Sequence, residues 1–327
     1  MHDKIGFEEH FNLPQFDHEL PPYANPQQMI EIRRKLLDVA DERLGEMDAA
    51  GIGYSLLSLT APGLQAVTDP AEAVTLARQV NDALAEIVAA SPGRYGGMAT
   101  LPLQDPQAAI AELERCATKL RFPGAMVNGF TDTPDGKGWY YDNERYLPFW
   151  ERAESLRVPI YLHPRNPLPA NAGIYEGHPE LMGAVWEFTV ETATHALRLF
   201  TSGLFDRFPT LRLVVGHLGE GLPFWMYRLD FMHRAQIISK RHKRLTPLKR
   251  KVSEYLRENV YFTTSGMAWE PAIMFTRSVV GADRVLYAMD YPYQYVPEEV
   301  AAMDQLPLTE QEKAAFFQLN AEAVFDL

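Results

Sequence analysis

The chain has 327 residues, 46% of them hydrophobic, and its 43 acidic and 31 basic side chains give a formal net charge of −12. This charge repels phosphate backbones and anionic lipid, so neither nucleic acid nor a membrane surface is an expected partner. No apolar run approaches the roughly 18 residues of a membrane span, and no signal-peptide pattern is present, which predicts a cytoplasmic protein. The single cysteine, Cys116, cannot form an internal disulfide and is expected to be a buried core thiol.

Short apolar runs alternate with segments of helical period along the whole chain, without a linker rich in Gly or Ser. Strands are expected at 4–11, 52–60, 95–102, 123–130, 158–165, 211–219, 259–266 and 285–292. Helices are expected at 26–50, 70–90, 105–120, 144–156, 180–203, 220–238 and 269–280. Eight such units predict an α/β fold, the closed (β/α)8 TIM barrel, as a single domain over 1–327. An open doubly wound sheet is the alternative, but the turn after the first strand lacks a glycine-rich phosphate loop.

Two inserts follow predicted strands directly. One is the proline-rich segment from Pro14 to Pro26 after strand one, and the other runs from Arg165 to Pro179 after strand five. Loops at the carboxyl ends of barrel strands surround the active site, so both inserts are expected to act as lids.

Polar residues end several of the apolar strands, which is where barrel enzymes hold their catalytic groups. Strand one ends with Glu8 and His10, which strand alternation puts on one face; strands five, six and eight end with His163, His217 and Asp290. Any one such histidine is more often a hydrogen-bonded core residue than a metal ligand. Together, imidazoles and carboxylates that converge on a barrel axis predict a divalent cation, which offsets the burial of the carboxylates.

His217 is followed three residues later by Glu220, in a glycine-rich turn from strand to helix. Glu220 could orient the imidazole of a catalytic histidine, or it could be a helix-start residue favoured by the helix dipole. His195 lies in a helical run where packing is the better interpretation, and no metal role is assigned to the remaining histidines.

Other polar and aromatic residues are expected near the mouth of the barrel. Asn128 could bind a substrate carboxylate or cap a turn, and the two alternatives are evenly balanced. An apolar pocket is suggested by the aromatic side chains Phe11, Tyr23, Trp225, Tyr291 and Tyr293. No Gly-x-Ser-x-Gly sequence is present, which argues against a serine hydrolase.

From about Lys4 to its end, the chain resembles the amidohydrolase superfamily, in particular the metal-dependent decarboxylases typified by γ-resorcylate (2,6-dihydroxybenzoate) decarboxylase. The resemblance rests on the segments 8–11 (EEHF), 101–106 (LPLQDP), 127–130 (VNGF), 161–169 (YLHPRNPLP), 217–223 (HLGEGLP) and 320–327. One segment differs, because Tyr291-Pro292-Tyr293-Gln294 stands where those decarboxylases have Trp-Pro-Phe-Glu. The ring substituents of the substrate are therefore left open.

The resemblance implies a role for each matching residue. The metal ligands would be Glu8, His10, His163 and Asp290. His217, Glu220 and Asp290 would be catalytic, and the substrate contacts would include Asn128, Tyr23 and Arg228, the last from a neighbouring subunit, beside the aromatic Phe11 and Tyr293.

The expected activity is the reversible, non-oxidative decarboxylation of an ortho-hydroxybenzoate by a homodimer or homotetramer. It would use one divalent ion, Mn²⁺ in preference to Zn²⁺, and no organic cofactor. The alternative is a hydrolase or hydratase that acts on a small lactone or ring-cleavage product with metal-activated water.

Overall fold

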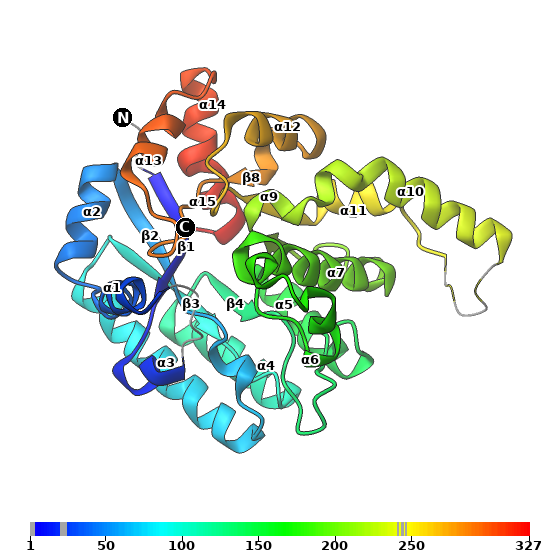
Figure 1. The fold of residues 1–327 in the computed structure, drawn as a ribbon, viewed down its shortest axis with the longest axis horizontal. Helices are drawn as coiled ribbons and strands as arrows, with labels where there is room; N and C mark the ends of the chain where they lie inside the picture. The colour runs from blue at the N-terminus through cyan, green and yellow to red at the C-terminus, as the bar shows by residue number, and fades with distance from the viewer. Residues whose placement is uncertain (1–3, 20–24, 241, 243–244, 246) are drawn as a thin grey trace.

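The computed structural model describes residues 4–19, 25–240, 242, 245 and 247–327. Its single sheet has eight strands in chain order, and each strand is parallel to the next. The strands are β1 (Lys4–Phe11), β2 (Ile52–Leu59), β3 (Tyr95–Thr100), β4 (Gly124–Asn128), β5 (Ile160–His163), β6 (Leu213–Val215), β7 (Val260–Thr263) and β8 (Val285–Leu286). The sheet curls into a barrel with helices outside it, as predicted (Figure 1). Just beyond β8, the amide of His10 donates to the carbonyl of Tyr291 at 2.8 Å and links the two ends of the sheet.

Helices connect the strands and cover the outside of the sheet. They are α1 (Pro26–Leu37), α2 (Glu42–Ala50), α3 (Pro70–Ala90), α4 (Pro106–Arg115), α5 (Leu147–Leu156), α6 (Pro169–Ala172), α7 (Glu187–Thr201), α8 (Leu204–Arg207), α9 (His217–Glu220), α10 (Leu222–Ser239), α11 (Val252–Glu258), α12 (Glu270–Val280), α13 (Pro297–Asp304), α14 (Glu310–Ala314) and α15 (Asn320–Phe325). Short 3₁₀ turns span Pro14–Glu19, Gly63–Ala66, Glu144–Tyr146, Gly173–Tyr175, Pro179–Leu181, Gly183–Val185 and Ala282–Arg284, and π turns span Cys116–Leu120 and Ala315–Leu319. No helix in the described ranges is both long and apolar enough to cross a bilayer.

α3 illustrates why the local sequence gives this pattern. Asp69 caps its first turn by accepting the amide of Glu72, and Pro70 occupies the position where a missing N–H costs nothing. Its buried face is mostly small and aliphatic, with Ala73, Val80 and Leu84 among the side chains that pack onto the sheet.

The core has two main parts, because successive side chains of a strand point to opposite faces. The larger part lies between the sheet and the helices. The smaller part combines alternate strand residues, such as Phe7, Tyr161 and Val214, with residues of α15. In it, the ring of Phe325 stands 4.8 Å from that of Phe7. Apolar side chains therefore fill the interior, and the polar strand-end residues collect beyond it at the carboxyl ends of the strands.

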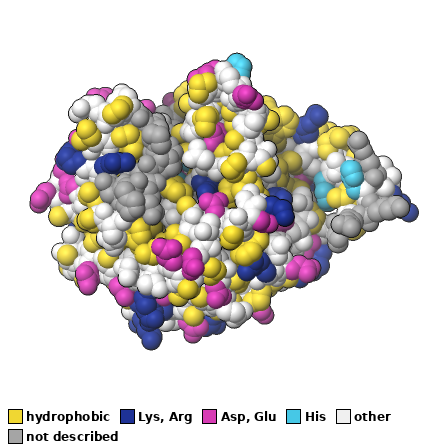
Figure 2. All heavy atoms as spheres, turned by 60° about the horizontal axis from the view of Figure 1, so that its bottom comes forward, with side chains coloured by type: hydrophobic (Ala, Val, Ile, Leu, Met, Phe, Trp, Pro, Cys, Tyr) yellow, Lys and Arg dark blue, Asp and Glu magenta, His cyan; other side chains and the backbone are white. Residues whose placement is uncertain are grey.

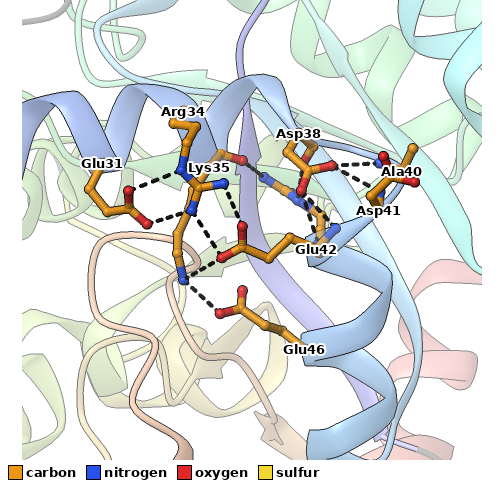
Figure 3. A network of polar contacts seen from close by, with 9 residues as sticks. Glu31, Arg34, Lys35, Asp38, Ala40, Asp41, Glu42 and Glu46 are labelled. Carbon is orange, nitrogen blue, oxygen red and sulfur yellow. Dashed lines mark hydrogen bonds and ion pairs between the residues drawn. The ribbon is translucent and has the colours of Figure 1, made fainter.

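Four predicted elements differ clearly from the structure. The helix expected at 180–203 begins only at Glu187, after the 3₁₀ turns Pro179–Leu181 and Gly183–Val185. The helix expected at 26–50 is divided into α1 and α2, because the Asp38 carboxylate accepts four backbone amides and starts a new helix (Figure 3). The strands expected at 211–219 and 285–292 end early, at Val215 and Leu286. The residues that follow take left-handed or irregular conformations, which a parallel ladder does not accommodate.

The two predicted inserts are only partly regular. The first contains the 3₁₀ turn Pro14–Glu19, and residues 20–24 lie outside the described residues. The second contains α6 and the turn Gly173–Tyr175. α10 extends well away from the barrel, toward the right of Figure 1.

Candidate metal and catalytic site

β1 brings two of the predicted ligands to the site through an irregularity. Its pairing with β2 shifts register between Gly6 and Glu9, and Glu8 has a φ of 53° in the left-handed region. Simple alternation therefore does not describe this strand. The Glu8 carboxylate instead reaches inward toward the histidines of β5 and α9.

The five predicted strand-end residues lie together. The Nε2 atom of His10 is 3.4 Å from Oδ1 of Asp290, and the rings of His10 and His163 meet edge-on with centroids 4.7 Å apart. The Glu8 carboxylate lies 3.9 Å from Nε2 of His163 through one oxygen and 3.9 Å from Nε2 of His217 through the other. Residues separated by up to 282 positions in the chain therefore meet at one end of the barrel.

Burial makes this cluster electrostatically unusual. Glu8 is 1% exposed and His10 is fully buried, and both Glu8 oxygens and Nε2 of His10 lack a hydrogen-bond partner. Desolvation raises the pKa of Glu8, although His217 opposes the shift. Burial, together with His10 and His217, holds the pKa of His163 well below its ordinary value, so this imidazole is neutral and has a lone pair to share.

A divalent cation fits this donor set. Carboxylate oxygens and neutral imidazole nitrogens bind both Mn²⁺ and Zn²⁺, and the unpaired Glu8 and His10 atoms are otherwise unexplained in the interior. Two ligands at about 2.1 Å from one ion are about 3.0–3.4 Å apart at octahedral or tetrahedral angles, which is close to the His10–Asp290 separation. In the described ranges, no three His, Cys, Asp or Glu side chains are already drawn in to metal-site spacing, so Glu8 would have to approach the histidines slightly.

His217 and Glu220 form a hydrogen-bonded pair. Nδ1 of His217 is 2.7 Å from Oε1 of Glu220, and the hydroxyl of Thr189 in α7 donates to the other carboxylate oxygen at 2.8 Å. Burial lowers the pKa of His217, but Glu220 and Glu8 raise it more, so the net shift is upward. The pair therefore has the fixed orientation expected of a carboxylate-supported histidine.

The turn that carries this pair is strained. His217, Leu218 and Glu220 all have positive φ, as does Asp290 after β8. Non-glycine residues adopt this conformation at a cost of about 1–3 kcal/mol each, and such residues concentrate at functional sites. Gly216, just before His217, leaves the space that Glu8 occupies, because a Cβ there would lie 2.6 Å from Oε1 of Glu8.

Two supporting residues, Ser58 and Tyr161, were not predicted from the sequence. The hydroxyl of Ser58 in β2 lies 3.2 Å from Nδ1 of His10. The hydroxyls of Tyr161 and Thr263 are 2.6 Å apart inside the barrel, and a Cβ at Gly216 would also contact Tyr161. The sequence does show a polar residue within an apolar strand in each case, but this pattern does not reveal which side chain the hydroxyl contacts.

The predicted substrate-binding residues are distributed unevenly. The backbone N–H of Asn128 donates to the side-chain oxygen of Gln65 at 3.1 Å, whereas the buried side-chain oxygen of Asn128 has no hydrogen-bond partner. The Tyr293 ring stands edge-on to His10 at 5.7 Å, and its hydroxyl is hydrogen-bonded to Thr60.

Of the other three predicted contacts, the two that the structure describes, Phe11 and Arg228, do not lie at the cluster within this chain. Phe11 is fully buried in the larger core, and Tyr23 lies outside the described residues. Arg228 is on the exposed side of α10, and no ion pair or hydrogen bond joins its side chain to any described residue.

Comparison with known proteins identifies the family. The amidohydrolase family model matches residues 17–327. The chain is 43% identical to the gamma-resorcylate decarboxylase of a Polaromonas species and 42% identical to that of Rhodococcus jostii, in each case over all of this chain and 99% of the relative.

Solved structures agree with these matches. A 2,6-dihydroxybenzoate decarboxylase in complex with 2,6-dihydroxybenzoate has a TM-score of 0.94 and 42% identity, with both chains covered completely. The 5-carboxyvanillate decarboxylase of Novosphingobium aromaticivorans, crystallised with manganese and a nitrobenzoic acid, has a TM-score of 0.94 and 40% identity over all of this chain and 96% of its own. These comparisons confirm the predicted resemblance: the chain belongs to the amidohydrolase family, in the group that contains the gamma-resorcylate decarboxylases.

Proposed function

We propose that the protein is a divalent-metal-dependent, non-oxidative decarboxylase of an ortho-hydroxybenzoate. The observation that carries this proposal is the meeting of Glu8, His10, His163 and Asp290 at the carboxyl ends of the strands, with ligand atoms that lack partners. The full-length identity of more than 40% to gamma-resorcylate decarboxylases supports the same reaction class. Both 2,6-dihydroxybenzoate and 5-carboxyvanillate are substrate candidates.

These four residues would hold one cation, and Mn²⁺ is the favoured ion because similar structures contain manganese, with Zn²⁺ as the alternative. When bound, the ion would stabilise the phenolate and carboxylate oxygens of the substrate and so increase electron density at the carboxyl-bearing ring carbon. The reaction needs no organic cofactor, because the aromatic ring accepts the electrons of the broken bond.

Asp290 is the proposed proton donor. Its free oxygen takes the phenol proton and delivers it to the carboxyl-bearing carbon, the C–C bond then breaks, and CO₂ leaves while the ring regains aromaticity. The phenolate product takes up one proton from solvent when it is released. His217 is oriented by Glu220 and lies beside Glu8, where it would assist the proton transfer by Asp290.

The remaining site residues would bind the substrate. Asn128 offers an unpaired amide oxygen, Tyr293 offers a ring held by Thr60, and Phe11 backs the site from the core. Tyr23 is proposed as a further contact on the strength of the family resemblance alone.

We also propose that the chain forms a homodimer or homotetramer through α10, with Arg228 entering the partner's site. Several large exposed apolar side chains on one projecting helix are typical of an interface. By contrast, charged and apolar side chains are intermixed over the face of the molecule that Figure 2 shows. The large exposed apolar side chains of α10 are Phe224, Trp225, Tyr227, Phe231, Met232 and Ile238. If Arg228 acts across subunits, mixing inactive Arg228→Ala and Asp290→Asn chains after dissociation should restore activity.

Two further properties are proposed. Residues 1–327 form one domain, since the first strand and the last helix pack together, and a single cooperative unfolding transition would support this. The cytoplasm is the proposed compartment, because the one buried cysteine indicates no dependence on oxidation, and cell fractionation tests it.

The central test is decarboxylation by the purified protein loaded with Mn²⁺. We expect CO₂ release from at least one member of a panel that includes 2,6-dihydroxybenzoate and 5-carboxyvanillate, and slow carboxylation of the corresponding phenol in concentrated bicarbonate. The Asp290→Asn variant should keep much of its metal but lose turnover. Hydrolysis of a lactone without any CO₂ release from the panel would overturn the proposal in favour of a hydrolase.

A further inference from the structure

Arg43 is an unusual residue that neither the fold nor the proposed reaction explains. It belongs to α2, on the outside of the barrel, yet it is only 2% exposed and is among the largest fully buried side chains. Its guanidinium lies beside His10 in β1 and Tyr291, which follows β8.

The guanidinium of Arg43 contacts three backbone carbonyls and one aromatic ring. Nη2 donates to the carbonyl oxygens of His10 and, at 3.1 Å, Lys35, and Nε donates to the carbonyl of Asp38 at 3.0 Å. Its central carbon stands 4.4 Å from the centroid of the Tyr291 ring. The Arg43 side chain thus contacts the backbone of His10, a proposed metal ligand. It also contacts the ring of Tyr291, which directly follows the proposed ligand Asp290.

These contacts add to a direct link between the same two strand ends. The His10 amide donates to the Tyr291 carbonyl at 2.8 Å, so His10 is held on its amide side by Tyr291, just beyond β8, and on its carbonyl side by Arg43. Because the Tyr291 ring also lies against the guanidinium, a change in Arg43 would loosen both strand ends at once. The separation that this would alter is the 3.4 Å between His10 and Asp290.

A buried arginine is a costly way to fill space. Removing a charge from water is strongly unfavourable, and well-packed apolar side chains of similar size are often at least as stable as buried charges. Within the described ranges Arg43 forms no ion pair with a carboxylate, and its Nη1 has no hydrogen-bond partner. Only arginine has a planar fork that can donate to separate carbonyls while its face stacks on a ring, and lysine cannot reproduce this.

We propose that Arg43 is a positioning residue for the metal centre. It fixes the backbone of His10 relative to Tyr291 and thereby sets the distance between the His10 and Asp290 side chains for the cation. The inference rests on the proposed function, because it needs a metal at this site. It assigns a role in the site to a residue from the outer helix layer.

The alternative is that Arg43 only attaches α1 and α2 to the barrel. Arg94 is a suitable control, because it makes the same kind of link at the opposite ends of the strands. It donates to the carbonyl of Gly53 at 3.2 Å and to the Asp48 carboxylate of α2 at 2.7 Å. Loss of Arg94 should lower stability without disturbing the metal centre.

The test compares Mn²⁺ binding by the parent protein, Arg43→Met, Arg43→Lys and Arg94→Met, at a temperature at which circular dichroism shows each to be folded. Free Mn²⁺ is counted by electron paramagnetic resonance, so the readout does not depend on activity. We expect Arg43→Met to weaken Mn²⁺ affinity by 10-fold to 100-fold, the usual effect of losing a residue that supports a ligand. Arg43→Lys should fall between Arg43→Met and the parent, and Arg94→Met should bind as the parent does.

The inference is overturned if a folded Arg43→Met binds Mn²⁺ within twofold of the parent, or if Arg94→Met is weakened equally. If Arg43→Met does not fold, Arg43→Lys decides, and parent-like affinity in that variant overturns the inference. Failure of the proposed function looks different, because the parent itself would then bind no Mn²⁺ at this site.

Discussion

Gly216→Ala tests the site geometry through a single added methyl group. Gly216 has φ −69° and ψ −177°, which alanine adopts without strain, so the backbone does not have to change. The new Cβ would lie 2.6 Å from Oε1 of Glu8 and 3.1 Å from the Tyr161 hydroxyl. The substitution therefore acts on the Glu8 carboxylate by contact alone.

The size of the effect follows from that distance. An ordinary contact begins at 3.4 Å, so the Glu8 oxygen has to retreat by about 0.8 Å. A displacement near 1 Å at a reacting centre costs about 100-fold in rate, or about 2.7 kcal/mol. Stability should change less, because crowding costs about 1–3 kcal/mol while the alanine restricts the unfolded chain by about 0.4–1 kcal/mol.

The assay measures kcat/KM for the accepted hydroxybenzoate, Mn²⁺ affinity by titration, and thermal unfolding. Gly45→Ala in α2 is the matched control, because nothing lies within 4 Å of its added Cβ, and it should leave kcat/KM and Mn²⁺ affinity unchanged. A folded Gly216→Ala protein with both values within threefold of the parent would refute the placement of Glu8 in the metal centre.

Three other changes have defined outcomes. Glu220→Gln removes the charge that orients His217 and should lower kcat by about 10²-fold to 10⁴-fold in steady-state assays, whereas Thr189→Val, which removes one hydrogen bond to Glu220, should lower it less. Chelation should abolish decarboxylation, and readdition of Mn²⁺ at 100 times its dissociation constant should raise the free energy of unfolding in urea by about 2.7 kcal/mol; no change in stability would contradict binding at the cluster. Burial, with Arg198 nearby, lowers the pKa of His195 to about 3. His195 therefore takes up a proton near pH 6.5 in the unfolded chain but stays neutral at that pH in the folded chain. The stability present above pH 6.5 is therefore lost as the pH falls toward 3. Between pH 6.5 and 5, the loss of unfolding free energy measured in urea should be about 1.6 kcal/mol smaller in His195→Gln than in the parent, and equal losses would argue against a buried neutral imidazole.

The sequence predicted the repeating architecture well, because apolar period and capping residues act locally. The start of α3 at Pro70 follows from its cap, and the eight strands follow from runs of β-branched and aromatic residues. The division of 26–50 into two helices was missed because Asp38 is an ordinary helix-surface residue until its carboxylate turns back onto four amides.

The site could be predicted by residue type but not by geometry. Glu8 and Asp290 were expected at strand ends. Glu8 instead lies in an irregular part of β1, Asp290 lies four residues after the end of β8, and both have positive φ. Nothing in the local sequence marks these conformations, because surrounding packing imposes them. The contact between Arg43 and His10 spans 33 residues, and no short pattern encodes it.

The left-handed residues have a consequence for making the protein more heat-resistant. Arg121, Arg157 and Lys240 share this conformation at helix ends far from the cluster, and glycine there should relieve roughly 1 kcal/mol apiece without touching the chemistry. The same exchange at His217 or Asp290 would relax the fold and remove the reacting group. Heat resistance can therefore be raised at the helix ends without changing the residues that carry the chemistry, and a variant stabilised there need not be a slower enzyme.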